Sequence, residues 1–333
     1  MDRRLFEYRE YFRKKMKNVP LFTFGDFVKQ DKAEVMPESA ASIDRDFVAK
    51  IALPRPADGN KGTFGSLLVW AGSPGMAGAA YMCANAACRS GVGIVHLWIS
   101  RELMTPMFLL LPQAISHPVP DDFPTAREEL SVLLPRMSSV VIGPGLDISE
   151  ASVRNGILYM AENAKTLVVD AGALAVIARE PDVFAPVFTQ RISRGLTPAV
   201  FTPHPGEFAR LVPGWQKEDR EGGAKAFADA WKVVLVLKGH KTVVCTQAGE
   251  CYINSTGNDG LAKGGSGDVL SGLIGSFMAQ GLPPGDAAIA GVYLHGLAGE
   301  YAAKALGKRY MQPTDLPAFF TDAFRYVRWE HEQ

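Results

Sequence analysis

A glycine-rich segment that ends in an aspartate is the part of this sequence with the most direct chemical meaning. Residues 262–270 read A-K-G-G-S-G-D-V-L, and an apolar run typical of a helix follows. Gly264, Gly265 and Gly267 allow several backbone N–H groups to point at one spot, and the positive end of the helix adds to that field. Such an arrangement suits a phosphoryl group during its transfer. The sequence therefore predicts an anion hole, in which Gly265 and Gly267 take part in catalysis.

Asp268 stands directly after this anion hole, at the start of an expected helix over residues 268–280. A carboxylate repels a resting phosphate, but its place there is explained if it accepts a proton from an attacking hydroxyl group. The alternative is a flexible glycine loop in which Asp268 is a helix N-cap. The turn at 254–260 and the apolar helix after the loop favour the anion hole, so we take Asp268 as the catalytic base.

His204 lies in the segment T-P-H-P-G-E, residues 202–207, between an expected strand and an expected helix. The two prolines fix the backbone around the ring, which orients it before any ligand binds. A lone histidine is more often structural, but the rigid loop at a strand end favours contact with a ligand. Glu207 is expected to cap the helix that follows.

The segment L-K-G-H-K-T, residues 237–242, ends another buried strand and predicts a nucleotide-binding loop. Lys238 and Lys241 carry charges that suit phosphates, and Gly239 permits the close approach of a nucleotide. A hairpin turn with solvated lysines is the alternative. Asp170 also follows a strand, and two interpretations of it stay open: it holds a metal-bound water or a ribose hydroxyl, or it caps the next helix.

These polar segments follow the strands of an alternating strand–helix pattern, which is typical of a sheet covered by helices on both faces. We expect strands at 66–71, 94–99, 140–142, 166–170, 200–202 and 233–238, a hairpin of 242–246 with 250–254, and helices at 79–89, 268–280 and 284–305. Ligands of open α/β sheets bind outside the carboxyl ends of the strands. The segments that directly follow strands, namely Gly72–Gly78, Gly143–Asp147, Asp170, His204 and Lys238, should therefore converge on one cleft.

Several classes of protein are excluded or disfavoured. The sequence has no G-x-x-x-x-G-K-[ST], which excludes a P-loop protein, and no G-x-G-x-x-G after a strand, which argues against a Rossmann dehydrogenase. The 333 residues include 35 basic and 35 acidic side chains, so the standing positive field of nucleic-acid and membrane-surface proteins is missing. No window approaches the ~18 apolar residues of a membrane span. We expect no nucleic-acid and no membrane partner.

Residues 1–45 are expected to form an extension without strand signals, followed by one domain over residues 46–333. A charged helix is expected near the start of the extension, with an apolar stripe formed by Leu5, Tyr8, Phe12 and Met16. We expect this helix to dock on its own domain or on a neighbouring subunit rather than on a membrane surface.

The four cysteines are Cys83, Cys88, Cys245 and Cys251, and none belongs to a C-x-x-C pair or to a cluster with zinc spacing. Four cysteines in so long a chain are too few for a disulfide framework. We interpret them as small buried apolar residues of a protein from the reducing cytoplasm. The identity of any metal ligands stays unknown from the sequence.

Seven motifs taken together resemble the ADP-dependent NAD(P)H-hydrate dehydratases. In chain order they are K-G-T-F-G-S-L-L-V-W-A-G-S-P-G-M-A-G-A-A, V-V-I-G-P-G-L, V-V-D-A-G-A-L, F-T-P-H-P-G-E, L-K-G-H-K-T, N-S-T-G-N-D-G-L-A-K-G-G-S-G-D-V-L-S-G and Y-L-H-G, spread over residues 61–303. Seven motifs in one order are far more specific than any one of them. The resemblance implies a ribokinase-like α/β fold with three layers, α/β/α, and a mostly parallel central sheet.

The resemblance also implies an activity: the repair of NADHX or NADPHX, which are hydrated forms of NADH and NADPH. ADP (or ATP) is the implied co-substrate, and Mg²⁺ would bridge its phosphates. Family matches place the substrate on Ala79, Gly145, His204 and Asp268. They place the nucleotide on Lys238, Gly239, His240, Lys241, Thr242 and Gly267. ADP is the expected donor, giving AMP and phosphate, and a cytoplasmic homo-oligomer of four copies is expected.

Two positions depart from the family pattern: Asp147 follows G-P-G-L where glycine is usual, and Gly172 stands where a second aspartate is usual. The second departure puts any role of that aspartate in doubt in this chain. Two other functions compete with the dehydratase. A kinase of the same fold, acting on a sugar or vitamin alcohol, would use the same anion hole and base. A nucleotide-sensing scaffold would leave Asp268 without a purpose. The segments T-P-H-P-G-E and N-S-T-G-N favour the dehydratase.

Overall fold

The computed structural model describes residues 40–52, 55–149 and 151–330, which belong to one compact unit. The apolar stripe expected at Leu5, Tyr8, Phe12 and Met16 lies outside the described residues. No helix in the described part of the chain is both long enough and apolar enough to pass through a membrane.

A single sheet of ten strands forms the centre of the described residues. The strands are β1 (Ala41–Ile43), β2 (Ser66–Trp70), β3 (Ile94–Ile99), β4 (Ile115–Pro118), β5 (Ser139–Ile142), β6 (Leu167–Val169), β7 (Val200–Phe201), β8 (Val234–Leu237), β9 (Val243–Cys245) and β10 (Cys251–Asn254). Their order across the sheet is β1-β10-β9-β8-β7-β6-β5-β2-β3-β4. Only β9 runs antiparallel to its neighbours, β8 and β10, so the expected mostly parallel sheet is confirmed.

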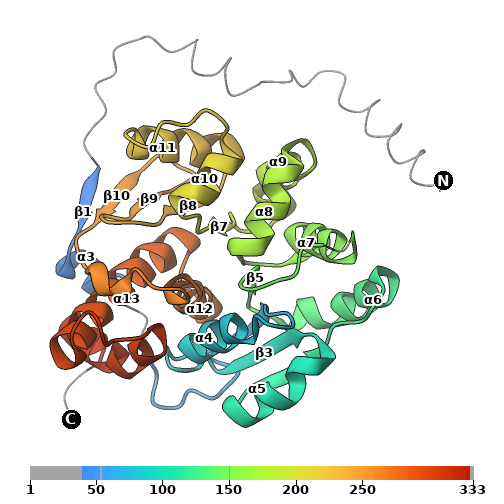
Figure 1. Ribbon diagram of the computed structural model, residues 1–333, viewed down its shortest axis with the longest axis horizontal. Coiled ribbons are helices and arrows are strands. Elements are labelled where there is room, and N and C mark those ends of the chain that lie inside the picture. Colours follow the sequence, from blue (N-terminus) through green and yellow to red (C-terminus); the bar gives the residue numbers. More distant parts are fainter. Residues whose placement is uncertain (1–39, 53–54, 150, 331–333) are drawn as a thin grey trace. The chain divides into compact units, whose positions relative to one another are not determined.

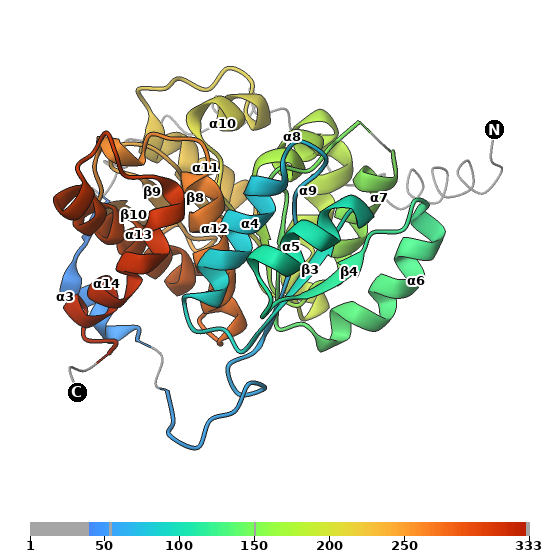
Figure 2. The same ribbon diagram turned by 60° about the horizontal axis from the view of Figure 1, so that its bottom comes forward.

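Helices cover both faces of the sheet (Figure 1). One layer consists of α4 (Ala77–Cys88), α12 (Ser266–Ala279) and α13 (Pro284–Leu306), with α3 (Arg45–Lys50) and α14 (Phe320–Tyr326) packed on α13. The other layer consists of α6 (Phe123–Leu133), α7 (Ala151–Asn163), α8 (Ala171–Arg179), α9 (Pro181–Thr189), α10 (Pro205–Leu211) and α11 (Arg220–Trp231). Near the edge strand β4 lies α5 (Met104–Leu110), as Figure 2 shows. The three-layer α/β/α fold is confirmed.

The helix that carries Asp268 is fixed by close packing. Two glycines of α12 allow the neighbouring elements to approach, because a Cβ at Gly272 would lie 2.0 Å from the carbonyl oxygen of Cys83 in α4. At Gly275 a Cβ would lie 2.3 Å from the side chain of Val141 in β5. Any larger residue would push α12 away from α4 or from the sheet. These contacts set the position of α12, and therefore of the glycine loop before it.

Two strands were not expected from the sequence. β1 lies within residues 1–45, so the expectation of no strand there is wrong; it pairs in parallel with β10, with Ala41 opposite Tyr252. Only Ile43 of its three residues is buried, so the segment is too short to show an alternating pattern. The compact unit accordingly includes residues 40–45. β4, of sequence I-S-H-P, is an edge strand without a fully buried residue. Like β1, it shows no clear alternation of apolar and polar residues that would predict a strand.

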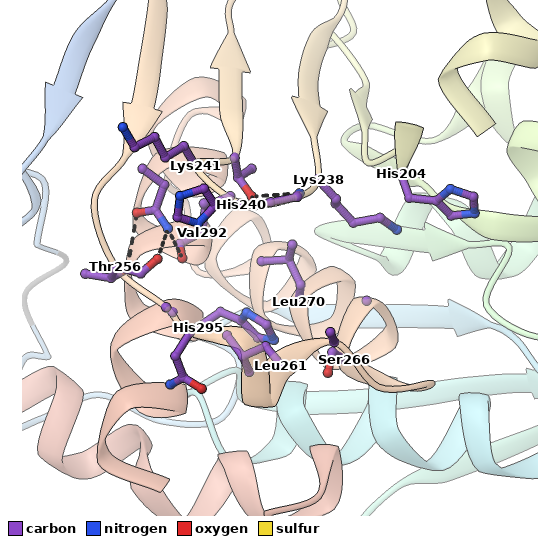
Figure 3. A pocket seen from close by; sticks show the side chains of 18 of the residues that line it. His204, Lys238, His240, Lys241, Thr256, Leu261, Ser266, Leu270, Val292 and His295 are labelled. Atoms are coloured by element: carbon purple, nitrogen blue, oxygen red, sulfur yellow. Dashed lines mark hydrogen bonds between the residues drawn. The ribbon is translucent and has the colours of Figure 1, made fainter. Parts of the chain in front are cut away.

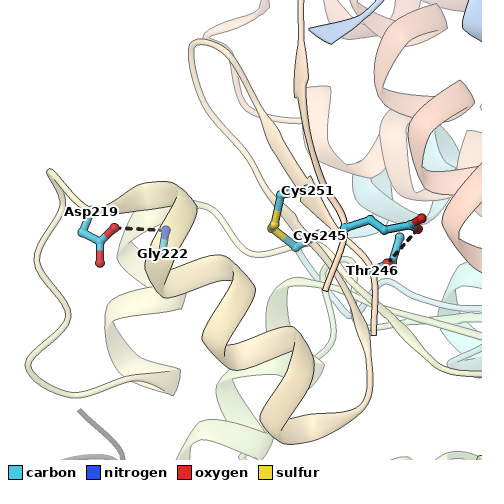
Figure 4. The surroundings of a disulfide bond; sticks show 6 residues. Asp219, Gly222, Cys245, Thr246 and Cys251 are labelled. Carbon is cyan, nitrogen blue, oxygen red and sulfur yellow. Dashed lines mark hydrogen bonds between the residues drawn. A yellow bond between two sulfur atoms is a disulfide. The ribbon is translucent and has the colours of Figure 1, made fainter. Parts of the chain in front are cut away.

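A disulfide bond corrects our interpretation of the cysteines. Cys245 and Cys251 are bonded across the hairpin of β9 and β10, where the register places one opposite the other (Figure 4). The expected hairpin over 242–246 and 250–254 is confirmed, and its symmetry about residue 248 already places these two residues opposite each other. Cys83 and Cys88 are free thiols, and Cys83 is fully buried, as expected.

Candidate functional site

A cavity of about 1230 Å³ is lined by residues that follow β6, β7, β8 and β10, together with the start of α12. A typical small-molecule site has roughly 300–1,000 Å³, so this cavity is larger than one ligand of ordinary size requires. The expected convergence on one cleft is confirmed for the segments at Asp170, His204 and Lys238, but it is wrong for those at 72–78 and 143–147, which do not line this cavity. Among the residues expected at the site, the cavity lining includes His204, Gly265, Gly267, Asp268 and the whole loop Lys238–Thr242.

Ala79 and Gly145 lie beside each other but do not line this cavity. A Cβ at Gly145 would lie 2.7 Å from the Cβ of Ala79, and the hydroxyl of Ser73 donates to the carbonyl of Gly145 at 2.9 Å. One turn further along α4, Met82 packs against Gly265, where a Cβ would lie 2.3 Å from its sulfur atom. The start of α4 therefore connects the Ala79–Gly145 pair to the glycine loop.

The glycine loop ends in a left-handed turn at the start of α12. Gly265 is the N-cap residue, with φ = 101°, a conformation that L side chains rarely adopt. No side chain caps the helix, and Asp268 lies within its first turn. The alternative in which Asp268 is the N-cap is therefore wrong. The N–H groups at this end have no side-chain cap, which is the feature that the predicted anion hole requires.

Asp268 has the proton affinity of a base that works near neutral pH. Burial, the Asp170 carboxylate and the Glu207 carboxylate raise its pKa to about 7, against a smaller lowering by Lys238. Near pH 7 a substantial fraction of Asp268 is therefore ionised and able to accept a proton. A group whose pKa matches the working pH is the most effective general base.

The ammonium group of Lys238 is paired with carboxylates at the wall of the cavity. Its Nζ atom lies 2.8 Å from Oδ1 of Asp170 and 3.9 Å from Oε2 of Glu207. Burial opposes the charge, but Asp170, Glu207 and Asp268 outweigh burial and raise the pKa of Lys238. Asp170 also caps α8 by accepting from the N–H of Ala171, so of its two interpretations the helix cap is confirmed.

His204 is the N-cap of α10 and forms a capping box with Glu207. The Nδ1 atom of His204 accepts from the backbone N–H of Gly206 at 3.0 Å, and Oε2 of Glu207 accepts from the N–H of His204 at 2.8 Å. The expected capping role of Glu207 is confirmed. More than half of the His204 side chain (54%) is exposed, so the capping role leaves the ring accessible from the cavity.

The nucleotide-binding loop predicted at Lys238–Thr242 is held by a residue that the sequence analysis did not consider. Arg220, the first residue of α11, donates to the carbonyl of Leu237 at 2.9 Å and to that of His240 at 2.8 Å. Its guanidinium lies against Gly239, where a Cβ would be 3.1 Å from the Nη atoms. Arg220 therefore fixes the outer side of the loop, opposite to the cavity-lining side.

Two buried polar atoms of the cavity lining have no hydrogen-bond partner among the described residues: Oγ of Ser266 and Nε2 of His295. Burial lowers the pKa of His295 to about 4, so its ring is neutral at pH 7. Both residues are labelled in Figure 3, where His295 projects from α13 towards the centre of the lining. Unpaired buried polar atoms are costly, and a bound ligand could supply the missing partners.

Three residues of the site were missed for different reasons. Ser271 follows Asp268 by three positions, and that helical spacing is a signal that could have placed both on one face. His295 lies in Y-L-H-G, which was quoted without a role. For Arg220 the sequence gives no signal, because its partners are backbone carbonyls. Among the described residues, no group of three metal-ligating side chains is assembled.

Comparison with known proteins agrees with this geometry. The family model described as NAD(P)H-hydrate dehydratase matches residues 67–321. The ADP-dependent (S)-NAD(P)H-hydrate dehydratase of Neisseria meningitidis is 35% identical over 257 residues, 76% of this chain and 82% of that protein. The bifunctional NAD(P)H-hydrate repair enzyme of Moorella thermoacetica is 38% identical over 286 residues, 84% of this chain. This chain spans about half (52%) of that relative's length.

Solved structures show the same likeness. The ADP/ATP-dependent NAD(P)H-hydrate dehydratase of Bacillus subtilis, co-crystallised with ATP and Mg²⁺, has a TM-score of 0.72 at 28% identity, covering 88% of this chain and all of that one. A ribokinase-like superfamily protein of Enterococcus faecalis has a TM-score of 0.73 at 25% identity, covering 87% of this chain and 97% of that one.

Proposed function

The chain belongs to the NAD(P)H-hydrate dehydratase family, and we propose that it dehydrates NADHX and NADPHX to NADH and NADPH at the expense of a nucleotide. The observation that carries this proposal is the position of Asp268. A carboxylate with a pKa of about 7 stands in the first turn of α12, directly after an uncapped glycine loop that lines the same cavity. This arrangement supports the proposal of a base that acts next to the bound phosphoryl group.

The proposed chemistry converts a poor leaving group into a good one. Asp268 takes the proton of the ring hydroxyl of NADHX while the hydroxyl oxygen attacks the terminal phosphorus of ADP, and the bond to AMP breaks. The N–H groups around Gly265 and Gly267 stabilise the charge on the transferring phosphoryl group. The lone pair of the ring nitrogen then expels phosphate, and loss of a proton from the neighbouring ring carbon restores the dihydropyridine. The products are NADH, AMP and phosphate.

We place the two ligands at different parts of the site. The nucleotide contacts Lys238, Gly239, His240, Lys241 and Thr242, and its reactive phosphate meets Gly267. The nicotinamide substrate contacts His204 and Asp268 in the cavity. Its contacts with Ala79 and Gly145, which do not line the cavity, would lie where the substrate extends past the start of α4. A cavity of about 1230 Å³ supports the binding of two ligands together.

Mg²⁺ is expected to arrive with the nucleotide. This ion keeps several waters and is usually bound by one or two carboxylates together with substrate phosphates. Residues 40–52, 55–149 and 151–330 contain no group of three histidine, cysteine or carboxylate side chains that could hold it. The donors that are present fit an ion held mainly by phosphate oxygens, and such an ion would neutralise charge on the transferring group.

The decisive experiment supplies NADHX with ADP and Mg²⁺ and follows the return of the reduced-nicotinamide absorbance. We expect recovery with the wild type and almost none with Asp268→Asn. Phosphorus NMR of the same mixture should show AMP and free phosphate. A stable phosphorylated product without recovered absorbance would identify a kinase instead, and no consumption of nucleotide would identify a binding protein.

We also propose that the chain self-associates, with four copies as the expected number. Three consecutive residues of α5 support an interface: Phe108, Leu109 and Leu110 are 68%, 72% and 55% exposed. They lie near the edge strand β4, whose Ile115 is 46% exposed. Such a patch on a soluble surface is typical of an interaction site. Sedimentation should show an assembly that Leu109→Arg dissociates; a monomer at micromolar concentration would contradict it.

A cytoplasmic location is proposed because the reaction draws on ADP or ATP together with reduced nicotinamide dinucleotides. The bond between Cys245 and Cys251 removes the cysteines as an argument for that location, since disulfides are rare in reducing compartments. Cell fractionation tests it: recovery of the chain outside the cytoplasmic fraction would contradict the proposal.

A further inference from the structure

Asp170 is buried beside the anion hole, and the proposed reaction gives it no role. Its carboxylate accepts hydrogen bonds from three different elements. Oδ1 accepts from the N–H of Ala171 at 2.9 Å and from Nζ of Lys238 at 2.8 Å, and Oδ2 accepts from the hydroxyl of Ser271 at 2.6 Å. Asp170 lies at the cavity lining, but only 1% of its surface is exposed and its carboxylate oxygens are already occupied by these donors.

The contact with Ser271 connects the end of β6 to the catalytic helix. Ser271 lies three residues after Asp268 in α12, so the two side chains project from the same face of that helix. The bond from Ser271 to Asp170 therefore restrains the first turn of α12 at the point where the base is attached. The hydroxyl of Thr202, at the end of β7, lies 3.5 Å from that of Ser271 and extends the restraint to the next strand.

The ion pair of Asp170 with Lys238 lies against the anion hole itself. A Cβ at Gly267 would lie 3.1 Å from Nζ of Lys238 and 3.9 Å from Oδ2 of Asp170. The ammonium group is thus fixed next to the backbone expected to receive the phosphoryl group, but its partner is Asp170 rather than Asp268. A helix cap alone would need only the bond to Ala171, so the other two contacts call for a further explanation.

Building on the proposed function, we propose that Asp170 is a positioning residue, which anchors Ser271 and Lys238 so that the Asp268 carboxylate is held at the anion hole as a free base. The anchor has two effects on Asp268. Through Ser271, Asp170 fixes the turn of α12. Because Asp170 forms an ion pair with Lys238, it also prevents that cation from pairing with Asp268.

The charges around Asp268 give this arrangement an electrostatic consequence. The groups that face Asp268 are the carboxylates of Asp170 and Glu207, the ammonium group of Lys238 and, from α4, the neutral thiol of Cys83, whose pKa is raised by burial and by Asp268 and Asp170. One cation is therefore shared among three carboxylates. Asp170 raises the pKa of Asp268, and an unanchored Lys238 would lower it. Removing the charge of Asp170 should therefore lower the pKa of Asp268 in two ways: a neighbouring negative charge is lost, and Lys238 becomes free to pair with Asp268.

The test is a direct titration of Asp268 by carbon NMR in protein labelled at the aspartate carboxyl carbon. The Asp268 signal is assigned by its absence from Asp268→Asn. Its midpoint near pH 7 should fall by about one unit or more in Asp170→Asn, because a like charge is lost and an opposite charge becomes available. Asp182→Asn, at an exposed position of α9, is the matched control and should leave the midpoint unchanged. An unchanged midpoint in folded Asp170→Asn would overturn the proposal.

Two further variants separate the two effects. Asp170→Asn/Lys238→Gln removes both charges, which also avoids a buried unpaired cation that could unfold the single variant. Its midpoint should return towards that of the wild type, and a midpoint equal to that of Asp170→Asn would refute the role of Lys238. Ser271→Ala keeps both charges, so amide exchange at Val269, whose N–H donates to the carbonyl of Gly265, should rise about tenfold with little change in midpoint; unchanged exchange would refute the role of Ser271.

None of these measurements requires turnover. A chain that fails to act on NADHX would refute the proposed function but would leave the titration interpretable. If NADHX is the substrate, the acidic limb of the pH profile of kcat/KM, which reports groups of the free enzyme, should move to lower pH in Asp170→Asn by the same amount as the NMR midpoint. A purely structural role would lower kcat/KM at every pH and leave that limb in place.

Discussion

The guanidinium group of Arg220 donates a hydrogen bond of 2.8 Å to the carbonyl oxygen of His240. The same side chain donates to the carbonyl of Leu237, so one arginine of α11 holds the two sides of the proposed nucleotide loop together. Arg220 does not line the cavity, and its contribution to binding would come through the shape of the loop.

Arg220→Ala should therefore weaken nucleotide binding by roughly 10- to 100-fold, as expected when two or more hydrogen bonds of about 1 kcal/mol that order a loop are lost. Arg220→Lys keeps the charge but cannot reach two carbonyls with a planar fork, so it should be intermediate. Calorimetry with ADP measures both, with Arg210→Ala on the exposed side of α10 as the control. Unchanged affinity in Arg220→Ala would show that the loop keeps its shape alone.

Asp268→Asn should retain nucleotide affinity and lower kcat by roughly 10²–10⁴, the usual contribution of a general base. The amide has nearly the same shape as the carboxylate, so packing around α12 should be preserved. Steady-state kinetics together with calorimetry test the separation of binding from turnover. Near-normal turnover in the variant would assign the base to another residue.

The pH dependence of kcat/KM, which is the turnover at low substrate concentration, should report the titration of Asp268 in the free enzyme. Its pKa is raised to about 7, and only the ionised form accepts a proton. The rate should therefore rise as the pH increases through about 7 and should fall about tenfold per unit below that range. Turnover measured from pH ~5.5 to ~8.5 tests the sign and the position. A rate that declines with increasing pH across this range would be incompatible with a carboxylate base.

His204→Ala should weaken binding of NADHX more than binding of the nucleotide. Because His204 also caps α10, this variant should lose about 0.5–2 kcal/mol of stability as well. His204→Asn is the matched variant, since asparagine is a good N-cap residue but has no imidazole ring. Both variants should lose substrate affinity to a similar degree, while only the alanine variant should melt earlier. A larger loss for ADP than for NADHX in calorimetry would move His204 to the nucleotide site.

ADP should exceed ATP in kcat/KM by at least about tenfold, or roughly 1.4 kcal/mol in the transition state. If the loop Lys238–Thr242 holds the sugar and base at a fixed distance from Gly267, one chain length of phosphates places the terminal group at Asp268. A longer donor would present the wrong phosphate and lose in-line geometry. Both donors are compared with one enzyme batch, after ADP is removed from the ATP. Equal activity with ATP would refute the donor preference and leave the dehydratase proposal intact.

Much of the fold could be predicted because most strands inside the sheet are runs of apolar residues. Val234–Leu237 is buried at every residue, as expected of a strand covered on both faces, and the sequence shows it as V-L-V-L. β1 and β4 were not predicted because they lie at the edges of the sheet, where strands are defined by pairing rather than by burial. The bond between Cys245 and Cys251 was not predicted, because the number of cysteines was compared with the length of the chain and their positions in the predicted hairpin were not considered.

The site was predictable where one local segment performs one task. G-G-S-G-D and T-P-H-P-G-E each hold their predicted site residues within a few positions, and the structure brings both to one cavity. The contacts of Asp170 with Lys238 and Ser271 span 68 and 101 residues of sequence, so no local pattern contains them. Such partners are determined by the order of the strands across the sheet, which a single sequence does not state.

The position of β1 has a consequence for biosynthesis. Ala41 pairs with Tyr252, so the first strand must wait for a partner that is made 211 residues later (252 − 41). At about 5–20 residues per second on the ribosome, that wait is roughly 10–40 s. Ala40 and Ser42 line the cavity, so this part of its wall cannot form before β10 has left the exit tunnel. A nascent chain stalled before this point would carry His204 and Lys238 but no closed pocket around them.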